Sequence, residues 1–176
     1  MQIAKASAPD RVGLYSTEER RRRDASVWTF VQGVLAPFQF LVFLVSLVLV
    51  LHYVWTGTGL AAANTSVIAK TLVLYLIMIT GSIWEKDVFG QYLFAPAFFW
   101  EDAVSMLVLA PHTFYLVAQG AGLLSPSALM VLALVAYLSY AVNAAQFVWK
   151  LRQARLQCLQ QQQANPASGG ISELAT

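Results

Sequence analysis

The sequence has few charged residues and a single cysteine, and both shortages narrow the class of protein. Only 11% of the 176 residues are charged, whereas 58% are hydrophobic. An ordinary soluble domain has roughly a quarter charged residues. Cys158 has no partner for an intrachain disulfide or a CxxC redox pair. Water is therefore not the main solvent of this chain, and disulfide exchange is a poor explanation of its function.

Several motifs of well-known enzyme classes are also absent. The chain has no Gly-rich phosphate loop, no HExxH, no GxSxG and no zinc-ligand spacing, which argues against nucleotide-driven transport and metalloprotease chemistry. Its small net charge of +2 comes from arginines that cluster beside an apolar run. Because they do not pattern a soluble face, we expect no nucleic acid partner.

Long apolar runs are abundant. A run of about 18 or more apolar residues is typical of a transmembrane helix, and four such runs cover 28–54, 67–84, 103–124 and 128–149. They predict an all-α fold, an integral membrane four-helix bundle over 28–149 with an aromatic cytoplasmic loop at 85–102. We expect a basic tail with a short interfacial helix at 1–27, and a helical extension with a disordered tail at 150–176.

The distribution of Lys and Arg predicts the orientation of the bundle. The N-terminal tail has six of these residues, the C-terminal tail has three and the central loop has Lys86, whereas the connections 55–66 and 124–127 have none. The positive-inside rule then places both termini and the central loop in the cytoplasm. Four spans agree with that parity.

Local patterns add detail to the tail and the first two spans. Ser16 and Glu19 have capping-box spacing, which predicts the start of a short helix. Lys70 lies one turn inside the second span, where we expect its long stem to reach the headgroups; a buried functional amine is the alternative. One face of the first span should point at other helices because three polar residues recur every seven positions, namely Gln32, Gln39 and Ser46.

The third span has polar residues along one helix face. The spacings of 4, 3, 4, 3 and 4 align Glu101, Ser105, Val108, His112, Tyr115 and Gln119. Polar groups inside a membrane are costly unless they face protein, water or a ligand, so this stripe is a candidate functional site. His112 lies about 16 Å along the helix axis from Glu101, roughly at mid-membrane.

The carboxylates at the span ends are predicted to differ in proton affinity. Glu85 lies at the C-terminal end of a helix beside Trp84, where the helix dipole and partial desolvation favour the protonated acid. Glu101 and Asp102 begin a helix, where the dipole favours the anion. Glu85 is thus the better general acid, and Glu101 or Asp102 the better base or helix cap.

The central loop is unusually aromatic for a connection. We expect a short helix around 88–94, broken at Pro96. Its rings either embed the loop in lipid or wall a flat apolar ligand. Asp87 and Lys86 either pair in the headgroup region or take part in such a site. The aromatic residues are Phe89, Tyr92, Phe94, Phe98, Phe99 and Trp100.

The runs WEKDVFGQY and FFWED, with the following PHTFYL and the upstream VWTFVQGVLAPFQFLVFLVSLVLVL, resemble the 3-vinyl bacteriochlorophyllide hydratase (chlorophyllide a hydratase) family of bacteriochlorophyll biosynthesis. The resemblance covers about 18–149. It implies a multi-pass hydro-lyase of the bacterial inner (cytoplasmic or intracytoplasmic) membrane. That enzyme adds water to the 3-vinyl group of chlorophyllide a or 3-vinyl bacteriochlorophyllide a and gives the 3-(1-hydroxyethyl) derivative.

With this resemblance, the residues that suit acid-base chemistry become catalytic candidates, namely Glu85, Asp87, Glu101, Asp102 and His112. Substrate-binding candidates are Trp84, Lys86, Phe89, Tyr92, Phe99, Trp100, Ser105 and Tyr115. His112 is either an axial ligand to the magnesium of the substrate or a proton carrier. We favour the ligand because its depth separates it from the carboxylates. No cofactor is expected, since the magnesium is part of the pigment, whose propionate would meet Lys86 or an N-terminal arginine.

Two other classes stay open. A non-catalytic pigment carrier or photosynthetic assembly factor would use the same loop and histidine without chemistry. A proton-coupled transporter would be expected to place its carboxylate at mid-membrane instead of at helix ends. The expected partners are the pigment and the lipid bilayer, and the resemblance is compatible with a homo-oligomer and with contacts to neighbouring pigment-biosynthesis enzymes.

Overall fold

The computed structural model describes residues 11–12 and 15–164, and almost all of this part of the chain is helical. Its longer helices are α2 (Val27–Thr56), α3 (Leu60–Phe89), α4 (Phe99–Gly120) and α5 (Pro126–Ala164). The first three, and α5 as far as Lys150, are each long and apolar enough to cross a membrane. The expectation of a helical protein with four apolar spans is therefore confirmed.

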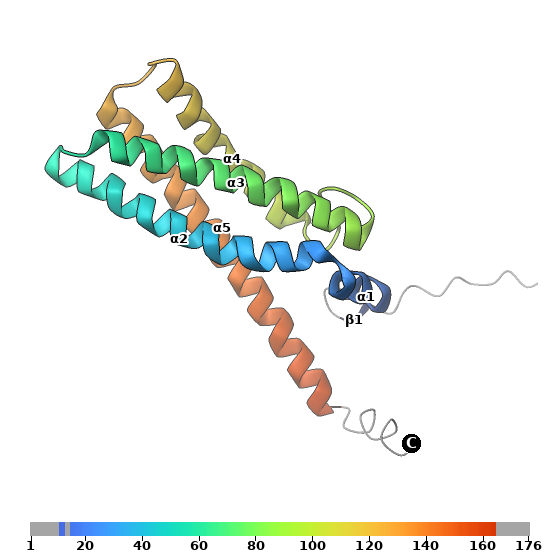
Figure 1. Cartoon of the computed structure of the whole chain (residues 1–176). Coiled ribbons are helices and arrows are strands. Elements are labelled where there is room, and N and C mark those ends of the chain that lie inside the picture. Colours follow the sequence, from blue (N-terminus) through green and yellow to red (C-terminus); the bar gives the residue numbers. More distant parts are fainter. Residues whose placement is uncertain (1–10, 13–14, 165–176) are drawn as a thin grey trace, which may run out of the picture.

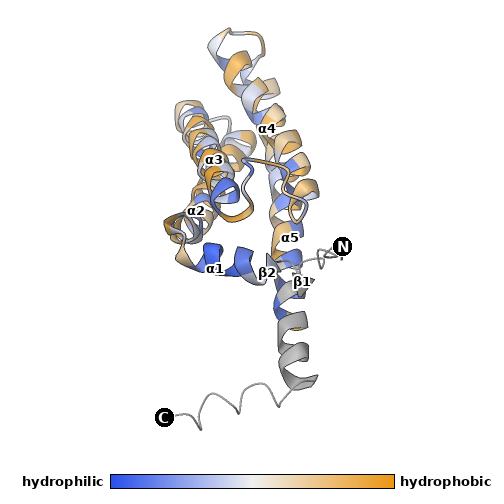
Figure 2. Ribbon diagram, turned by 90° about the vertical axis from the view of Figure 1, so that its right-hand side faces the viewer, coloured by the Kyte–Doolittle hydropathy of each residue, from blue (hydrophilic) through white to orange (hydrophobic). Residues whose placement is uncertain are grey.

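A short basic helix, α1 (Thr17–Ala25), precedes the spans and is strongly hydrophilic (Figure 2). The predicted capping box is present: Ser16 Oγ accepts from the Glu19 N–H at 3.2 Å, and the Glu19 carboxylate accepts from the Ser16 N–H at 2.7 Å. One element was not expected. Strand β1 (Arg11–Val12) pairs antiparallel with β2 (Tyr15–Ser16) just before α1.

The spans form two helical hairpins (Figure 1). α2 packs along α3, and α4 packs along α5, which continues beyond the bundle. The connections 57–59 and 121–125 lie at one end of the bundle, whereas α1 and the segment 90–98 lie at the other end (Figure 1). The short helix expected around 88–94 is not present. α3 instead continues through Phe89 and ends at Gly90, whose φ of 84° is left-handed and suits glycine because it has no Cβ.

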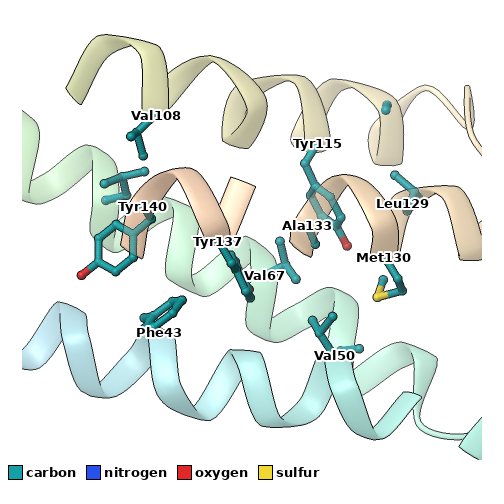
Figure 3. Close-up of a cluster of buried hydrophobic side chains, with 13 residues drawn as sticks. Phe43, Val50, Val67, Val108, Tyr115, Leu129, Met130, Ala133, Tyr137 and Tyr140 are labelled. Atoms are coloured by element: carbon teal, nitrogen blue, oxygen red, sulfur yellow. The ribbon is translucent and has the colours of Figure 1, made fainter. Parts of the chain in front are cut away.

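All four spans contribute to the core. The buried cluster includes Phe43 and Val50 of α2, Val67 of α3, Tyr115 of α4 and Met130 of α5 (Figure 3). The outward faces are also apolar, since Phe30 is 74%, Leu107 70% and Leu138 68% exposed. An outer surface of this kind is favourable in lipid and unfavourable in water. The chain is therefore a membrane protein.

The polar face of α2 points at other helices, as the sequence predicted. Gln32 Nε2 donates to Thr80 Oγ1 at 2.7 Å, and Ser46 Oγ bonds to Ser66 Oγ at 2.8 Å. Gln39 is 1% exposed. These bonds tie α2 to α3 inside the bundle, where few water molecules compete for them.

The prediction for Lys70 was wrong, because this lysine does not reach the headgroups. It is 0% exposed, and its Nζ contacts His112 Nε2 and lies 4.2 Å from the centre of the Tyr140 ring. α3 begins at Leu60, so Lys70 lies about 15 Å along the helix axis from its start. From that depth the stem does not reach the end of the bundle, and the amine turns inward.

Candidate active site

Two acidic residues meet where α3 ends and α4 begins. Glu85 lies in the last turns of α3 and is 5% exposed, whereas Asp102 lies in the first turn of α4 and is 8% exposed. Their carboxyl groups lie close enough to each other for a hydrogen bond. A hydrogen bond between two carboxyl groups requires a proton on one of them. A pair joined by such a bond shares one proton and thereby contains both an acid and a base.

The segment 90–98 covers this carboxyl pair. The Ala95 N–H donates to Glu85 Oε2 at 3.2 Å, and the Phe94 N–H donates to Asp102 Oδ2 at 2.7 Å. Phe94 has a φ of 60°, a left-handed conformation that is unfavourable for a bulky side chain. This strained residue directs two successive amides at the two carboxyl groups, so the carboxyls help to hold the segment in place.

Buried aromatic rings pack beside the pair. Phe98 is 4% exposed and is surrounded by four rings with centroids 5.7 to 6.2 Å away: Tyr15, Trp84, Phe89 and Phe147. Burial raises the pKa of the Tyr15 phenol above its usual value, so this hydroxyl stays neutral. Two predicted substrate-binding residues, Trp84 and Phe89, thus pack against other protein rings in this structure.

Other aromatic residues of the same end face outward. Tyr92 is 54%, Phe99 47% and Trp100 74% exposed. Lys86 Nζ donates to the Tyr92 hydroxyl at 2.7 Å, which fixes the lysine near the surface. These rings are accessible to lipid or to a ligand.

The remaining predicted carboxylates lie apart from the pair. Glu101 Oε2 is 2.7 Å from Lys150 Nζ of α5, and Lys150 also donates to the Ala97 carbonyl. Asp87 accepts a hydrogen bond from Ser26 Oγ at the junction of α1 and α2. The structure thus brings Glu85 and Asp102 together, while Glu101 and Asp87 each contact a different partner.

The predicted stripe of α4 faces the bundle interior. Val108, His112 and Tyr115 are between 0 and 2% exposed. Ser105 Oγ accepts from Asn143 Nδ2 at 3.1 Å, and the Tyr115 hydroxyl donates to Asn64 Oδ1 at 2.8 Å. The polar groups of the stripe therefore link α4 to α5 and to α3.

Both ring nitrogens of His112 have partners. Nδ1 lies 2.8 Å from the Val108 carbonyl, so it donates to that oxygen, and Nε2 accepts from Lys70 Nζ. His112 also lies about 15 Å along α4 from Asp102. Its role as magnesium ligand or proton carrier stays a prediction, and either role requires Lys70 to leave Nε2. Within the described residues, no three His, Cys, Asp or Glu side chains gather around a common metal position.

Sequence reasoning did not identify a groove on the outside of this end. It has a volume of about 520 Å³ and lies between the start of α4 and α5, lined by Trp100, Glu101, Val104, Gln146, Trp149, Lys150 and Gln153. The α5 residues have i, i+3, i+4 and i+7 spacing, which places them on one helix face. That spacing is visible in the sequence. The predicted span ends at residue 149, however, so Lys150 and Gln153 were not counted as part of the same helix face.

Comparison with known proteins links this chain to a family. The family model described as 2-vinyl bacteriochlorophyllide hydratase matches residues 15–153. A relative of that name from Rhodobacter capsulatus is 61% identical over 150 residues, which cover 85% of this chain and 86% of the relative. One from Cereibacter sphaeroides, with the same name, is 60% identical over 157 residues, covering 89% and 96%. No solved structure matches the chain.

Proposed function

The chain belongs to the 2-vinyl bacteriochlorophyllide hydratase family, and from this premise we propose that it hydrates the vinyl group on ring A of chlorophyllide a or 3-vinyl bacteriochlorophyllide a. The vinyl position is called 2 or 3 because tetrapyrroles are numbered in two ways. The product has a 1-hydroxyethyl group. The observation that supports the proposal best is the close, buried pair of carboxyl groups of Glu85 and Asp102.

The shared proton suits both halves of a hydration. The protonated carboxyl group transfers its proton to the terminal vinyl carbon, and the π electrons of the double bond form the new C–H bond. The cation left on the adjacent carbon is delocalised over the macrocycle. Water attacks this carbon and passes a proton to the carboxylate, so the pair regains its single proton. We assign Glu85 as the acid and Asp102 as the base, and each such proton transfer accelerates a reaction by about 10² to 10⁴.

The vinyl group reaches the pair only when the segment 90–98 moves. The two carboxyl residues are 5% and 8% exposed, and the amides of Phe94 and Ala95 occupy two of their oxygens. The left-handed Phe94 destabilises the closed segment and thereby lowers the cost of opening it. We propose that pigment binding displaces this segment and brings water to the pair together with the substrate.

The basic residues favour one orientation in the membrane. α1 contains Arg20, Arg21, Arg22 and Arg23, and α5 contains Lys150, Arg152 and Arg155 at the same end of the bundle as the carboxyl pair. The positive-inside rule supports placing this end and both termini in the cytoplasm of a bacterium, with the spans in its inner membrane. The reaction needs no cofactor besides the magnesium that belongs to the pigment.

The proposal is tested with purified protein, chlorophyllide a and ¹⁸O-labelled water in detergent. We expect one ¹⁸O atom in the hydroxyethyl product. The same label should appear with the 3-vinyl bacteriochlorophyllide substrate, and comparing the two hydration rates shows which pigment is preferred. Tight pigment binding without a labelled product would contradict the hydratase and support a pigment carrier.

A further inference from the structure

We infer that the groove between α4 and α5 holds the pigment macrocycle, with its flat face against Trp100 and Trp149. This inference rests on the proposed function, because that function supplies the flat ligand. It deepens the function by assigning a binding surface outside the bundle core.

The volume and the lining residues of the groove suit a large flat ring. Trp100 is 74% and Trp149 69% exposed, and the two indoles come from different helices to line the same groove of about 520 Å³. Small-molecule sites are commonly about 300 to 1,000 Å³. Tryptophans at a membrane interface often contact only headgroups, but that role does not require two of them to line one groove.

The polar residues of the groove match the rim of the pigment. Gln146 and Gln153 lie one turn before and one turn after Trp149 on α5, and their amides can donate to carbonyl groups at the macrocycle edge. Lys150, which also lines the groove, forms an ion pair with Glu101, with 2.7 Å between Nζ and Oε2. The charges of these two groove residues therefore cancel.

The groove lies beside the helix turn that contains one residue of the proposed catalytic pair. Glu101 lines the groove, and the next residue of α4, Asp102, lies close to Glu85. Successive helix residues point about 100° apart, so a macrocycle against Glu101 lies beside the turn that presents Asp102. When the segment 90–98 opens, the vinyl edge of the ring can turn toward the pair.

The inference is tested by titrating chlorophyllide a into purified protein and measuring Kd from the pigment absorption. Trp100→Ala and Trp149→Ala should each raise Kd by about tenfold, as expected for loss of one aromatic stacking partner. Trp149→Phe should restore most of the affinity. Gln146→Trp should abolish binding by filling the groove. The matched control is Trp55→Ala, since Trp55 is 79% exposed at the opposite end of α2.

The outcomes separate the groove from the chemistry. Trp149→Ala should raise KM and leave kcat unchanged, because Trp149 contacts the ring and not the reacting carbon. If the Trp149→Ala protein binds chlorophyllide a as tightly as the Trp55→Ala protein does, the groove is not the pigment-binding site, even if the wild-type protein hydrates the pigment. Groove-dependent binding without product in the wild-type protein would instead reject the proposed function and leave the groove in place.

Discussion

Replacing Glu85 by glutamine removes the shared proton with little change of shape. The glutamine oxygen can still accept from the Ala95 N–H, which now donates at 3.2 Å, and its amide can donate to Asp102. The fold of the segment 90–98 should therefore persist. What disappears is the carboxylic acid that protonates the vinyl carbon, because an amide does not release a proton at neutral pH.

The expected loss of rate follows from the role of the acid. Removing a general acid lowers a rate by about 10² to 10⁴, which corresponds to about 2.7 to 5.4 kcal/mol of activation free energy. Pigment affinity should stay within about twofold, because Glu85 is 5% exposed and does not line the groove. Asp102→Asn should cause a loss of similar size, and the double variant should be little worse than either single variant, because the two residues act as a unit.

The assay is a single-turnover hydration at saturating pigment, followed by the shift of the pigment absorption when the vinyl conjugation is lost. Glu18→Gln is the matched control, since this glutamate is exposed on α1 and pairs only with neighbouring arginines in the described part of the chain. A Glu85→Gln protein that retains more than about a third of the wild-type rate would refute the assignment. The acid role would then pass to Glu101.

Three further substitutions test other parts of the structure. His112→Ala removes the buried partner of Lys70, so it should lower stability by about 1 to 3 kcal/mol. If the macrocycle lies in the outer groove, which His112 does not line, the chlorophyllide Kd should stay within twofold, whereas a tenfold weaker Kd would support the magnesium ligation predicted from the sequence. Lys70→Met removes a buried amine that has no carboxylate partner among the described residues, so it should raise the thermal midpoint in detergent, whereas a lower midpoint would show that the amine contributes net stability. Phe94→Gly should be about 1 kcal/mol more stable than Phe94→Ala in thermal unfolding, because only glycine adopts a φ of 60° without strain; equal stabilities would contradict the strain.

The parts of this structure that were predictable from sequence are those set by local patterns. Long apolar runs specify the spans because each needs only its own length and composition. The capping box at Ser16 involves residues three apart, and the inward stripe of α4 follows from helical periodicity. Both were therefore predicted correctly.

The features that sequence reasoning missed depend on where elements end and meet. Lys70 was placed near the membrane surface because the Ala-, Asn- and Ser-containing start of α3 is not apolar enough to count as part of a span. The pairing of Glu85 with Asp102 depends on the path of the segment 90–98, which turns at Gly90 and at the left-handed Phe94. Residue spacing along the chain does not specify that path, and the groove involving Trp149 likewise requires knowing how α5 crosses α4.

The two amides that close the segment 90–98 couple a proton to a movement of the backbone. Amide N–H groups donate more strongly to a carboxylate than to a neutral carboxylic acid. The closed segment therefore stabilises the carboxylate form of the pair. By thermodynamic reciprocity, protonation of the carboxylate destabilises the closed segment by the same free energy. The proton count of Glu85 and Asp102 and the position of Phe94 and Ala95 are thus a single linked equilibrium, so each turnover that moves a proton also changes the tendency of the segment to open.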